Sequence, residues 1–373
     1  MAKNVFILGA GASAHAGVPL MKDFYDEAIN LYLKKQLDFE DLGSFELIEN
    51  IYLNIIRKIY ANFNFDPELR NVETIFSIID MSRITGKIPG LNELPIKPIP
   101  DLSLLNLHIN KFISRTIEKK TYFELSPLGT INSPEEYSSF TNRILKWITS
   151  NDILGCCIIT FNYDIALDYV IEVTFGHEYL DYGFPDYGIN TARPTGSTKL
   201  LKMHGSINWT RCRECNAVQA VNISDTCRIT PSINRIEISK KFKEVKCAKC
   251  EKYALGPSSI IVPPTWNKTE NIEIENIWKQ SAQELSEAKN IFIIGYSFPK
   301  TDLFFQYLLA LGTINIMNLE RFWVFDKNSK IDDKYIGLLN YDIKRKYRFF
   351  KMPFIDAISI LETEISNHGD QFY

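Results

Sequence analysis

Four of the seven cysteines occur in two pairs that have the spacing of metal ligands. Two residues separate Cys212 from Cys215, and two separate Cys247 from Cys250. Two Cys-x-x-Cys turns can hold one Zn²⁺ in a tetrahedral set of thiolates, with Zn–S distances of about 2.3 Å. Four thiolates leave no coordination position for a substrate. We therefore expect a structural zinc site that holds together residues 210–256, a segment too short and polar to form its own core.

A second chemical signal lies near the start of the chain, where an apolar run ends in closely spaced glycines. Residues 3–9 predict a buried parallel strand, and Gly11 and a helix-compatible stretch follow it. A glycine-rich turn between a strand and a helix brings backbone N–H groups to a diphosphate. In such a turn Gly9 allows the bend, Gly11 lets the diphosphate approach, and Ala14 lets helix and strand pack closely. The predicted dinucleotide-contacting residues of this loop are Gly9, Ala10, Gly11, Ala12, Ser13 and Gly17. We expect the adjacent His15 to be exposed.

Polar groups follow several later apolar runs. The run that ends near residue 160 is followed by Asn162 and Asp164, and the run that ends near residue 203 is followed by His204. An open parallel sheet displays its ligand-binding groups beyond the carboxyl ends of its strands. An imidazole there suits general base catalysis, because its pKa lies near working pH. The further candidates at later strand ends are Gly295, Ser297, Phe298 and Asp326.

The elements that must position these groups alternate in type along the chain. Short apolar runs predict strands at residues 3–9, 156–161, 199–203, 259–262, 291–294, 322–325 and 348–351. Apolar residues at helical spacing predict helices at residues 21–37, 45–63, 72–84, 104–119 and 134–149. Ser133 is the predicted N-cap of the last helix, and Pro134 its first residue. The predicted fold class is α/β, a Rossmann-like doubly wound parallel sheet with a helical insertion and a small four-cysteine zinc module.

The same pattern predicts how the chain is divided. We assign the nucleotide-binding core to residues 1–22, 150–209 and 257–330, the helical insertion to 23–149, and the zinc module to 210–256. Residues 331–373 supply a C-terminal strand and helix that complete the core. The helical insertion serves either as a lid and scaffold over the cofactor cleft or as an oligomerisation surface.

Bulk composition excludes some classes of protein. The formal net charge is −3, with 45% hydrophobic and 23% charged residues, which is ordinary for a soluble globular protein. No apolar run approaches the about 20 residues of a transmembrane helix, and the first run is too short for a signal peptide, so we expect a cytoplasmic protein. Lysines crowd residues 240–252, but Glu244 and Glu251 dilute their charge. This favours a solvated face over a nucleic-acid or acidic-partner patch. No acidic cluster has the spacing of a two-metal nuclease.

The combination of motifs resembles the sirtuin family. Sirtuins carry a Gly-Ala-Gly-x-Ser phosphate loop, a Thr-Gln-Asn-x-Asp segment, a His-Gly pair shortly before a four-cysteine zinc module, and a later Gly-Thr-Ser. The matching segments are residues 9–13, 160–164, 204–205 and 295–297. The resemblance covers residues 1–22 and 150–330. It implies a Rossmann-like fold, NAD⁺ as substrate and a structural Zn²⁺.

The chain departs from deacetylase-type sirtuins at three places. The Phe-Arg pair expected after Gly17-Val18-Pro19 is missing, and Phe161 replaces the motif's Gln. The Phe-Gly-Glu segment that helps form the acetyl-lysine groove is replaced within residues 261–268. These departures are similar to those of divergent bacterial sirtuin-like proteins of phage-defence systems, which hydrolyse NAD⁺. Several of those proteins form oligomers and work with a HerA-type ATPase or an Argonaute-like protein.

The resemblance thus implies an NAD⁺ hydrolase (NADase) that releases nicotinamide and ADP-ribose, in antiviral defence by NAD⁺ depletion. Asn162 and Asp164 would orient nicotinamide or the attacking water, and His204 would be the general base or organise the ribose. Gly295, Ser297, Phe298 and Asp326 would contact the cofactor, with Gly295, Ser297 and Asp326 at the adenosine ribose. Two alternatives stay open: an NAD⁺-dependent protein deacylase, and a non-enzymatic NAD⁺ or ADP-ribose sensor within an ATPase or nucleic-acid-binding complex.

Overall fold

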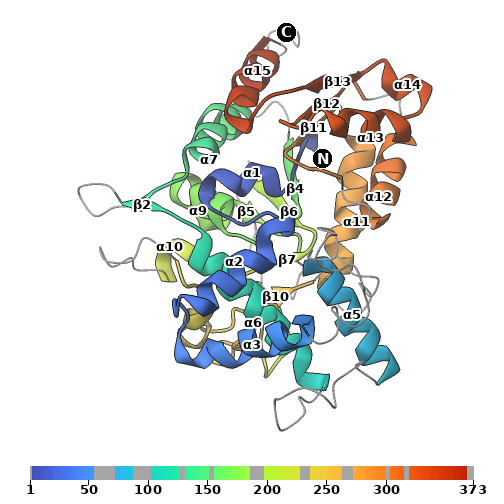
Figure 1. The fold of residues 1–373 in the computed structure, drawn as a ribbon. Coiled ribbons are helices and arrows are strands. Elements are labelled where there is room, and N and C mark those ends of the chain that lie inside the picture. The colour runs from blue at the N-terminus through green and yellow to red at the C-terminus, as the bar shows by residue number, and fades with distance from the viewer. Residues whose placement is uncertain are drawn as a thin grey trace.

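A computed structural model describes residues 2–53, 72–86, 102–125, 131–150, 155–184, 197–226, 236–262, 272–298, 303–314 and 319–367. Its centre is a seven-stranded parallel sheet with the order β13-β12-β11-β1-β4-β6-β5 (Figure 1). The strands are β1 (Ala2–Leu8), β4 (Gly155–Thr160), β5 (Leu180–Asp181), β6 (Thr198–Lys202), β11 (Asn290–Ile294), β12 (Arg321–Phe325) and β13 (Tyr347–Phe350). The predicted α/β fold class with a doubly wound parallel sheet is confirmed.

Strand order defines where a ligand can bind in this sheet. β1 pairs with β4 on one side and with β11 on the other, and its Phe6 lies opposite Ile158 and Phe292. Successive strands extend from β1 through β4 to β6, and then from β11 to β13 on the opposite side. The loops after β1 and β11 therefore leave in different directions. Ligands of doubly wound folds bind at such a reversal point.

One predicted strand lies elsewhere. The strand predicted at residues 259–262 is confirmed as β10 (Ile260–Ile261), but it pairs antiparallel with β7 (Gly205–Ser206) outside the main sheet, so its expected place in the parallel sheet is wrong. The segment is held where the chain leaves β6, because Val262 donates its N–H to the carbonyl of His204 at 2.8 Å. β5 was not predicted, since two residues carry no periodic signal.

The first half of the chain is mainly helical, as predicted. Its larger helices are α2 (Met21–Leu33), α3 (Phe39–Ile51), α5 (Val72–Thr85) and α6 (Leu102–Lys120). α2 ends earlier than predicted, where Lys35 adopts a positive φ of 54°. The predicted helix at 45–63 begins earlier instead, at Phe39, and its residues 54–63 lie outside the described ranges.

The predicted helix at 134–149 is a composite. α7 (Glu135–Phe140) continues through a π-helical turn (Thr141–Leu145) into α8 (Lys146–Ser150). Pro134 occupies the N-cap position with an extended ψ of 131°, so the predicted cap at Ser133 is wrong by one residue. The hairpin of β2 (Glu124–Leu125) and β3 (Ile131–Asn132) comes just before this helix.

Further helices lie among and after the later strands of the sheet. They are α9 (Ala166–Phe175), α11 (Ile272–Glu287), α12 (Leu303–Ile314), α13 (Lys330–Leu338), α14 (Tyr341–Lys344) and α15 (Phe354–Asn367). Among the described residues, no helix combines the length and the apolar character needed to span a bilayer.

The helical segment and the sheet share one hydrophobic core. Phe6 of β1 packs edge-on against Phe140 of α7 at 5.1 Å between ring centroids. Buried Phe45 of α3 and Phe112 of α6, whose rings are 4.7 Å apart, belong to the same cluster of buried side chains. Deleting the helices would therefore expose part of the core that supports the sheet.

A buried network of charges ties the helices to the segment between the cysteine pairs. Arg115 of α6 donates to Glu118 at 2.6 Å and to the Ser239 hydroxyl at 2.7 Å. The other oxygen of Glu118 accepts from the Ser239 N–H at 2.8 Å, and Asp41 of α3 accepts from Arg115 at 3.2 Å. Burial raises the pKa of the Glu118 carboxyl, against the opposing effect of Arg115 and Ser239. These ion pairs and hydrogen bonds connect α3, α6 and the short helix Ser239–Glu244.

Replacing Glu118 should destabilise the fold strongly. Glu118→Ala removes the closest acceptor of the Arg115 guanidinium and the buried acceptor of the Ser239 N–H, and we expect it to cost about 3–5 kcal/mol of unfolding free energy. The matched control is Glu362→Ala, since Glu362 pairs with Arg143 at the surface, where both side chains are more than a third exposed. That change should cost at most about 1 kcal/mol. Equal shifts of the two denaturation midpoints would contradict the buried network.

Candidate functional site

Backbone contact between two loops forms the centre of the site. After β1 the chain makes only a short helix, α1 (Ala10–Ser13), and a 3₁₀ turn that ends at Gly17, where φ is +78°. The N–H of Gly11 donates to the carbonyl of Gly295, the residue after β11, at 2.9 Å. A Cβ on Gly9 or Gly11 would lie 2.5 or 2.8 Å from the Gly295 oxygen. These glycines are thus required by the approach of one loop to the other.

This contact also limits how the loop can bind a diphosphate. The N–H groups of Gly9, Gly11 and Ala12 donate to the carbonyls of Ile294, Gly295 and Gly9. A side chain at Gly11 would point at Gly295, whereas the sequence suggested that this glycine makes room for a ligand. A phosphate at this loop would therefore use the other backbone N–H groups and the positive end of the short helix.

Asn162 joins the turn after β4 to this loop. Its Nδ2 donates to the carbonyl of Gly9 at 2.9 Å and to the hydroxyl of Ser13 at 2.8 Å, and the residue is 9% exposed. Thr160 strengthens the same junction, because its hydroxyl donates to the Leu8 carbonyl at 2.9 Å. Both hydrogens of the Asn162 amide are used in these bonds, so Oδ1 is the atom that can accept a hydrogen bond from a ligand.

Tyr137 is a member of the site that the sequence did not indicate. Its hydroxyl lies 2.6 Å from the Ser13 Oγ, and the ring is fully buried. His15 packs edge-on against this ring at 4.9 Å and is only 14% exposed, so the expectation of an exposed His15 is wrong. Burial lowers the pKa of His15 to about 4, which leaves it neutral near pH 7. A tyrosine on an apolar helix face carries no signal of such a contact in one sequence.

Asp164 lies at the start of α9 with one carboxylate oxygen unused. Oδ1 accepts from the N–H of Ala166 at 3.0 Å, which satisfies one free donor of the helix N-terminus. Oδ2 is buried and makes no hydrogen bond within the described part of the chain. Burial raises the pKa of this carboxyl, while the Lys202 ammonium, the Ala166 N–H and the Ser13 hydroxyl act in the opposite direction.

His204 lies in an aromatic setting two residues after the end of β6. It is 3% exposed, and its ring packs against Phe161 at 5.2 Å and Tyr163 at 5.9 Å. Phe161 in turn stacks on Tyr296 at 4.6 Å. Gly205 fixes the chain direction after the histidine, because its φ is +82° and a Cβ there would lie 2.2 Å from the Ile260 oxygen. These contacts hold the imidazole beside the Asn162–Asp164 turn.

The structure also brings together the candidates after β11 and β12. Lys334 of α13 donates to the carbonyls of Ser297 at 3.0 Å and Phe298 at 3.4 Å. Asp326, directly after β12, accepts from the N–H of Asn328 at 2.8 Å, and burial raises the pKa of its carboxyl. Ser297 is exposed, whereas Phe298 is buried with a positive φ of 52°. Lys334 is a further basic residue here that the sequence did not single out.

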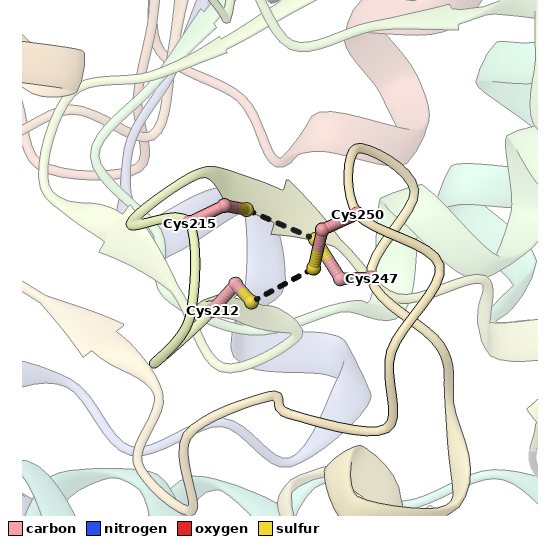
Figure 2. Close-up of side chains that lie close together, drawn as sticks. All are labelled: Cys212, Cys215, Cys247 and Cys250. Atoms are coloured by element: carbon pink, nitrogen blue, oxygen red, sulfur yellow. Dashed lines mark hydrogen bonds between the residues drawn. The ribbon is translucent and has the colours of Figure 1, made fainter.

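The four paired cysteines converge on one point (Figure 2). The Sγ atoms of Cys212 and Cys250 are 3.6 Å apart, as are those of Cys215 and Cys247, and all four lie within 4.8 Å of one another. Four sulfurs at about 2.3 Å from a tetrahedral Zn²⁺ would be about 3.8 Å apart. The donor set therefore fits a structural zinc, as predicted.

The two cysteine turns have the same backbone design. In each, the first cysteine accepts a hydrogen bond from the residue after the second cysteine, Asn216 or Glu251, at 3.0 and 2.8 Å. Those two residues have positive φ values of 60° and 59°. Each turn thus presents both thiols on the same side, toward the point where the four sulfurs meet.

Among the described residues, the two other cysteines lie away from this cluster. Cys156 and Cys157 are buried in β4, where burial raises the pKa of both thiols, and Cys227 lies outside the described residues. Several lysines of residues 240–252 pair with acidic side chains: Lys240 with Asp38 and Glu237, Lys241 with Glu244, and Lys252 with Glu214. This pairing supports the interpretation of a solvated face.

Loss of two of the paired thiols should abolish metal binding. We expect the purified chain to contain about one zinc per molecule by elemental analysis. Cys215→Ser with Cys247→Ser should release it and speed amide hydrogen exchange in residues 236–262, because the two turns lose their shared ion. Cys156→Ala changes a thiol in β4 and should keep the zinc. Full zinc content in the double variant would exclude these four residues as the ligands.

Comparisons with known proteins give a resemblance among solved structures alone. No protein-family model and no curated protein matches the chain. A Sir2 homologue in complex with NAD is similar, with 13% identical residues, 99% of this chain and 91% of that chain covered, and a TM-score of 0.43. A mutant Sir2 homologue in complex with ADP-ribose (14%, 98% and 93%, TM-score 0.41) is also similar, as is Sir2Tm bound to a propionylated peptide (11%, 97% and 93%, TM-score 0.39). At this level of similarity, function has to be inferred from the chain's own residues.

Proposed function

We propose that the chain is an NAD⁺ hydrolase that cleaves the bond between nicotinamide and ribose. The observation that carries this proposal is the Asn162 amide, which donates to both Gly9 and Ser13 and so joins the turn after β4 to the glycine loop. A dinucleotide bound at the reversal point between β1 and β11 would then have its diphosphate near that loop. Its nicotinamide end would lie toward Asn162, Asp164 and His204.

The site supplies groups suited to this reaction. Water attacks the anomeric carbon of the ribose, the carbon–nitrogen bond breaks, and its electron pair goes to the nicotinamide ring nitrogen. Positive charge builds up on the ribose in the transition state. A buried carboxylate such as Asp164, with Oδ2 free, stabilises that charge more strongly than an exposed one. His204 would orient the ribose or accept the proton of the water.

Water rather than acetyl-lysine is the proposed acceptor. The chain lacks the Phe-Gly-Glu segment of the acetyl-lysine groove, and Phe161 replaces the Gln of the motif. Phe161 is buried against Tyr296 and Phe305, at 4.6 and 4.8 Å between ring centroids. An apolar wall beside His204 in place of an amide supports a site that differs from the deacylase pattern.

The direct test is a chromatographic assay of NAD⁺ with the purified chain, with and without an acetyl-lysine peptide. We expect nicotinamide and ADP-ribose without peptide, and a loss of turnover of at least about 100-fold in His204→Ala and in Asn162→Ala. His177→Ala and Asn142→Ala remove the same chemical groups at places away from the site, and both should keep activity. Turnover only with peptide would support a deacylase. Tight ADP-ribose binding without turnover would support a sensor.

We further propose that the biological output is NAD⁺ depletion in the cytoplasm during antiviral defence, by a homo-oligomer that works with a HerA-type ATPase or a similar partner. The support is the sequence resemblance described above. Light scattering of the full-length chain should give a mass above that of one chain, and addition of a HerA-type ATPase should raise NAD⁺ turnover. A monomer whose turnover the ATPase does not change would contradict this part. The full chain is needed, because the helices share the core of the sheet.

A further inference from the structure

A fully buried lysine lies beneath the Asn162–Asp164 turn. Lys202, the last residue of β6, is 1% exposed. Its ammonium donates to the backbone carbonyl of Asp164 at 2.5 Å and pairs with Oδ2 of Asp168 at 2.9 Å. Asp168, in the first turn of α9, is held from its other oxygen by the hydroxyl of Tyr182 at 2.8 Å.

This arrangement is costly, and the sheet alone does not require it. Removing an ammonium and a carboxylate from water costs several kcal/mol per ion, and a well-packed apolar pair often stabilises a core as well or better. The buried charges also do not balance: Lys202 lies between the Asp168 carboxylate and the Asp164 residue, whose Oδ2 has no hydrogen bond among the described residues. The ammonium thus pairs directly with one carboxylate, that of Asp168, and binds the backbone carbonyl of the residue that carries the other.

Lys202 links the elements that carry the candidate catalytic groups. β6 reaches His204 two residues later, and the carbonyl that Lys202 binds belongs to the turn with Asn162 and Asp164. The groups that face the Asp164 carboxyl come from four elements. They are Ser13 of α1, Tyr137 of α7, Asp168 of α9 and Lys202 of β6. Among these, Lys202 is the cation.

We propose that Lys202 is a positioning residue of the site: its ammonium fixes the Asn162–Asp164 turn to the strand that leads to His204 and keeps the buried Asp164 carboxylate ionised. This inference rests on the proposed function, because it assigns Lys202 a role in the same reaction. Lys202 acts through Asp164 and needs no contact with the substrate.

Substitutions at Asp168 and at Lys202 should shift the pKa of Asp164 in opposite directions. Asp168→Asn keeps the contact with Tyr182 but removes a like charge near Asp164, so the pKa of Asp164 falls and the acidic limb of the kcat–pH profile moves to lower pH. Lys202→Met in that Asp168→Asn background removes the cation without leaving an unpaired carboxylate. The pKa of Asp164 then rises, and the acidic limb moves up by about 1–3 pH units relative to Asp168→Asn alone. A merely structural role for the pair would not move the limb in opposite directions.

Lys199→Met is the matched lysine control. Lys199 lies toward the other end of β6 and pairs with the buried Glu284, so its loss also disrupts an ion pair of this strand. We expect lower thermal stability and an unchanged acidic limb. Far-ultraviolet circular dichroism and zinc content of each variant establish that it is folded.

A second readout separates this inference from the proposed function. Carbon-13 spectra of aspartate-labelled protein, with Asp164→Asn to assign the signal, report protonation of Asp164 without any turnover. If the wild type does not cleave NAD⁺, the proposed function fails, and the titration alone decides the inference. The inference is supported if the Asp164 titration midpoint falls in Asp168→Asn relative to the wild type and rises in the double variant relative to Asp168→Asn. An unmoved midpoint, or an unmoved acidic limb in an active enzyme, overturns it.

Discussion

The close approach of the loops after β1 and β11 is the constraint on which the rest of the site depends. Gly9, Gly11 and Gly295 meet backbone to backbone, and a Cβ on any of them would lie 2.5–2.8 Å from the other loop. This contact closes the reversal point of the sheet and fixes the carbonyl of Gly9. Asn162 can then donate to that carbonyl and to Ser13. The position of the turn after β4 therefore depends on the contact between the other two loops.

A series of hydrogen bonds connects α7 and the turn after β4 to the loop after β1. Tyr137 bonds to Ser13, Ser13 to Asn162, and Asn162 to the β1 loop. Buried polar groups strengthen one another in a medium of low dielectric constant, provided that each has a partner. Because Tyr137 comes from α7, this helix belongs to the framework of the site. The hydrogen bonds between α6 and Ser239 extend the same network toward the cysteine cluster.

The sequence predicted the parts of this protein that follow from local pattern. Alternation of apolar runs with turns located most strands of the main sheet, and the paired spacing of Cys212, Cys215, Cys247 and Cys250 located the metal cluster. It misplaced the strand at residues 259–262, because a short apolar run does not show which strand will pair with it. It also missed Tyr137, Lys202 and Lys334, whose neighbours in space are far away in sequence. The structure also gives Gly11 a different role from the predicted one. The glycine is needed because the loop after β11 packs against it, and a sequence pattern cannot reveal that contact.

The buried charges near Asp164 are unfavourable for folding but suit the proposed chemistry. An apolar side chain at position 202 would suit the buried end of β6. At position 164, a shorter polar side chain would suffice to accept the hydrogen bond from the N–H of Ala166. The chain instead holds an ammonium between the Asp168 carboxylate and the backbone carbonyl of Asp164, whose Oδ2 makes no hydrogen bond among the described residues. Burial raises the pKa of the Asp164 carboxyl, and the nearby cation opposes that effect. A buried carboxylate that stays ionised is costly for folding but useful where positive charge develops on a substrate. The polar interior beneath Asn162 and Asp164 is therefore explained better by chemistry at the end of β4 than by the stability of the sheet.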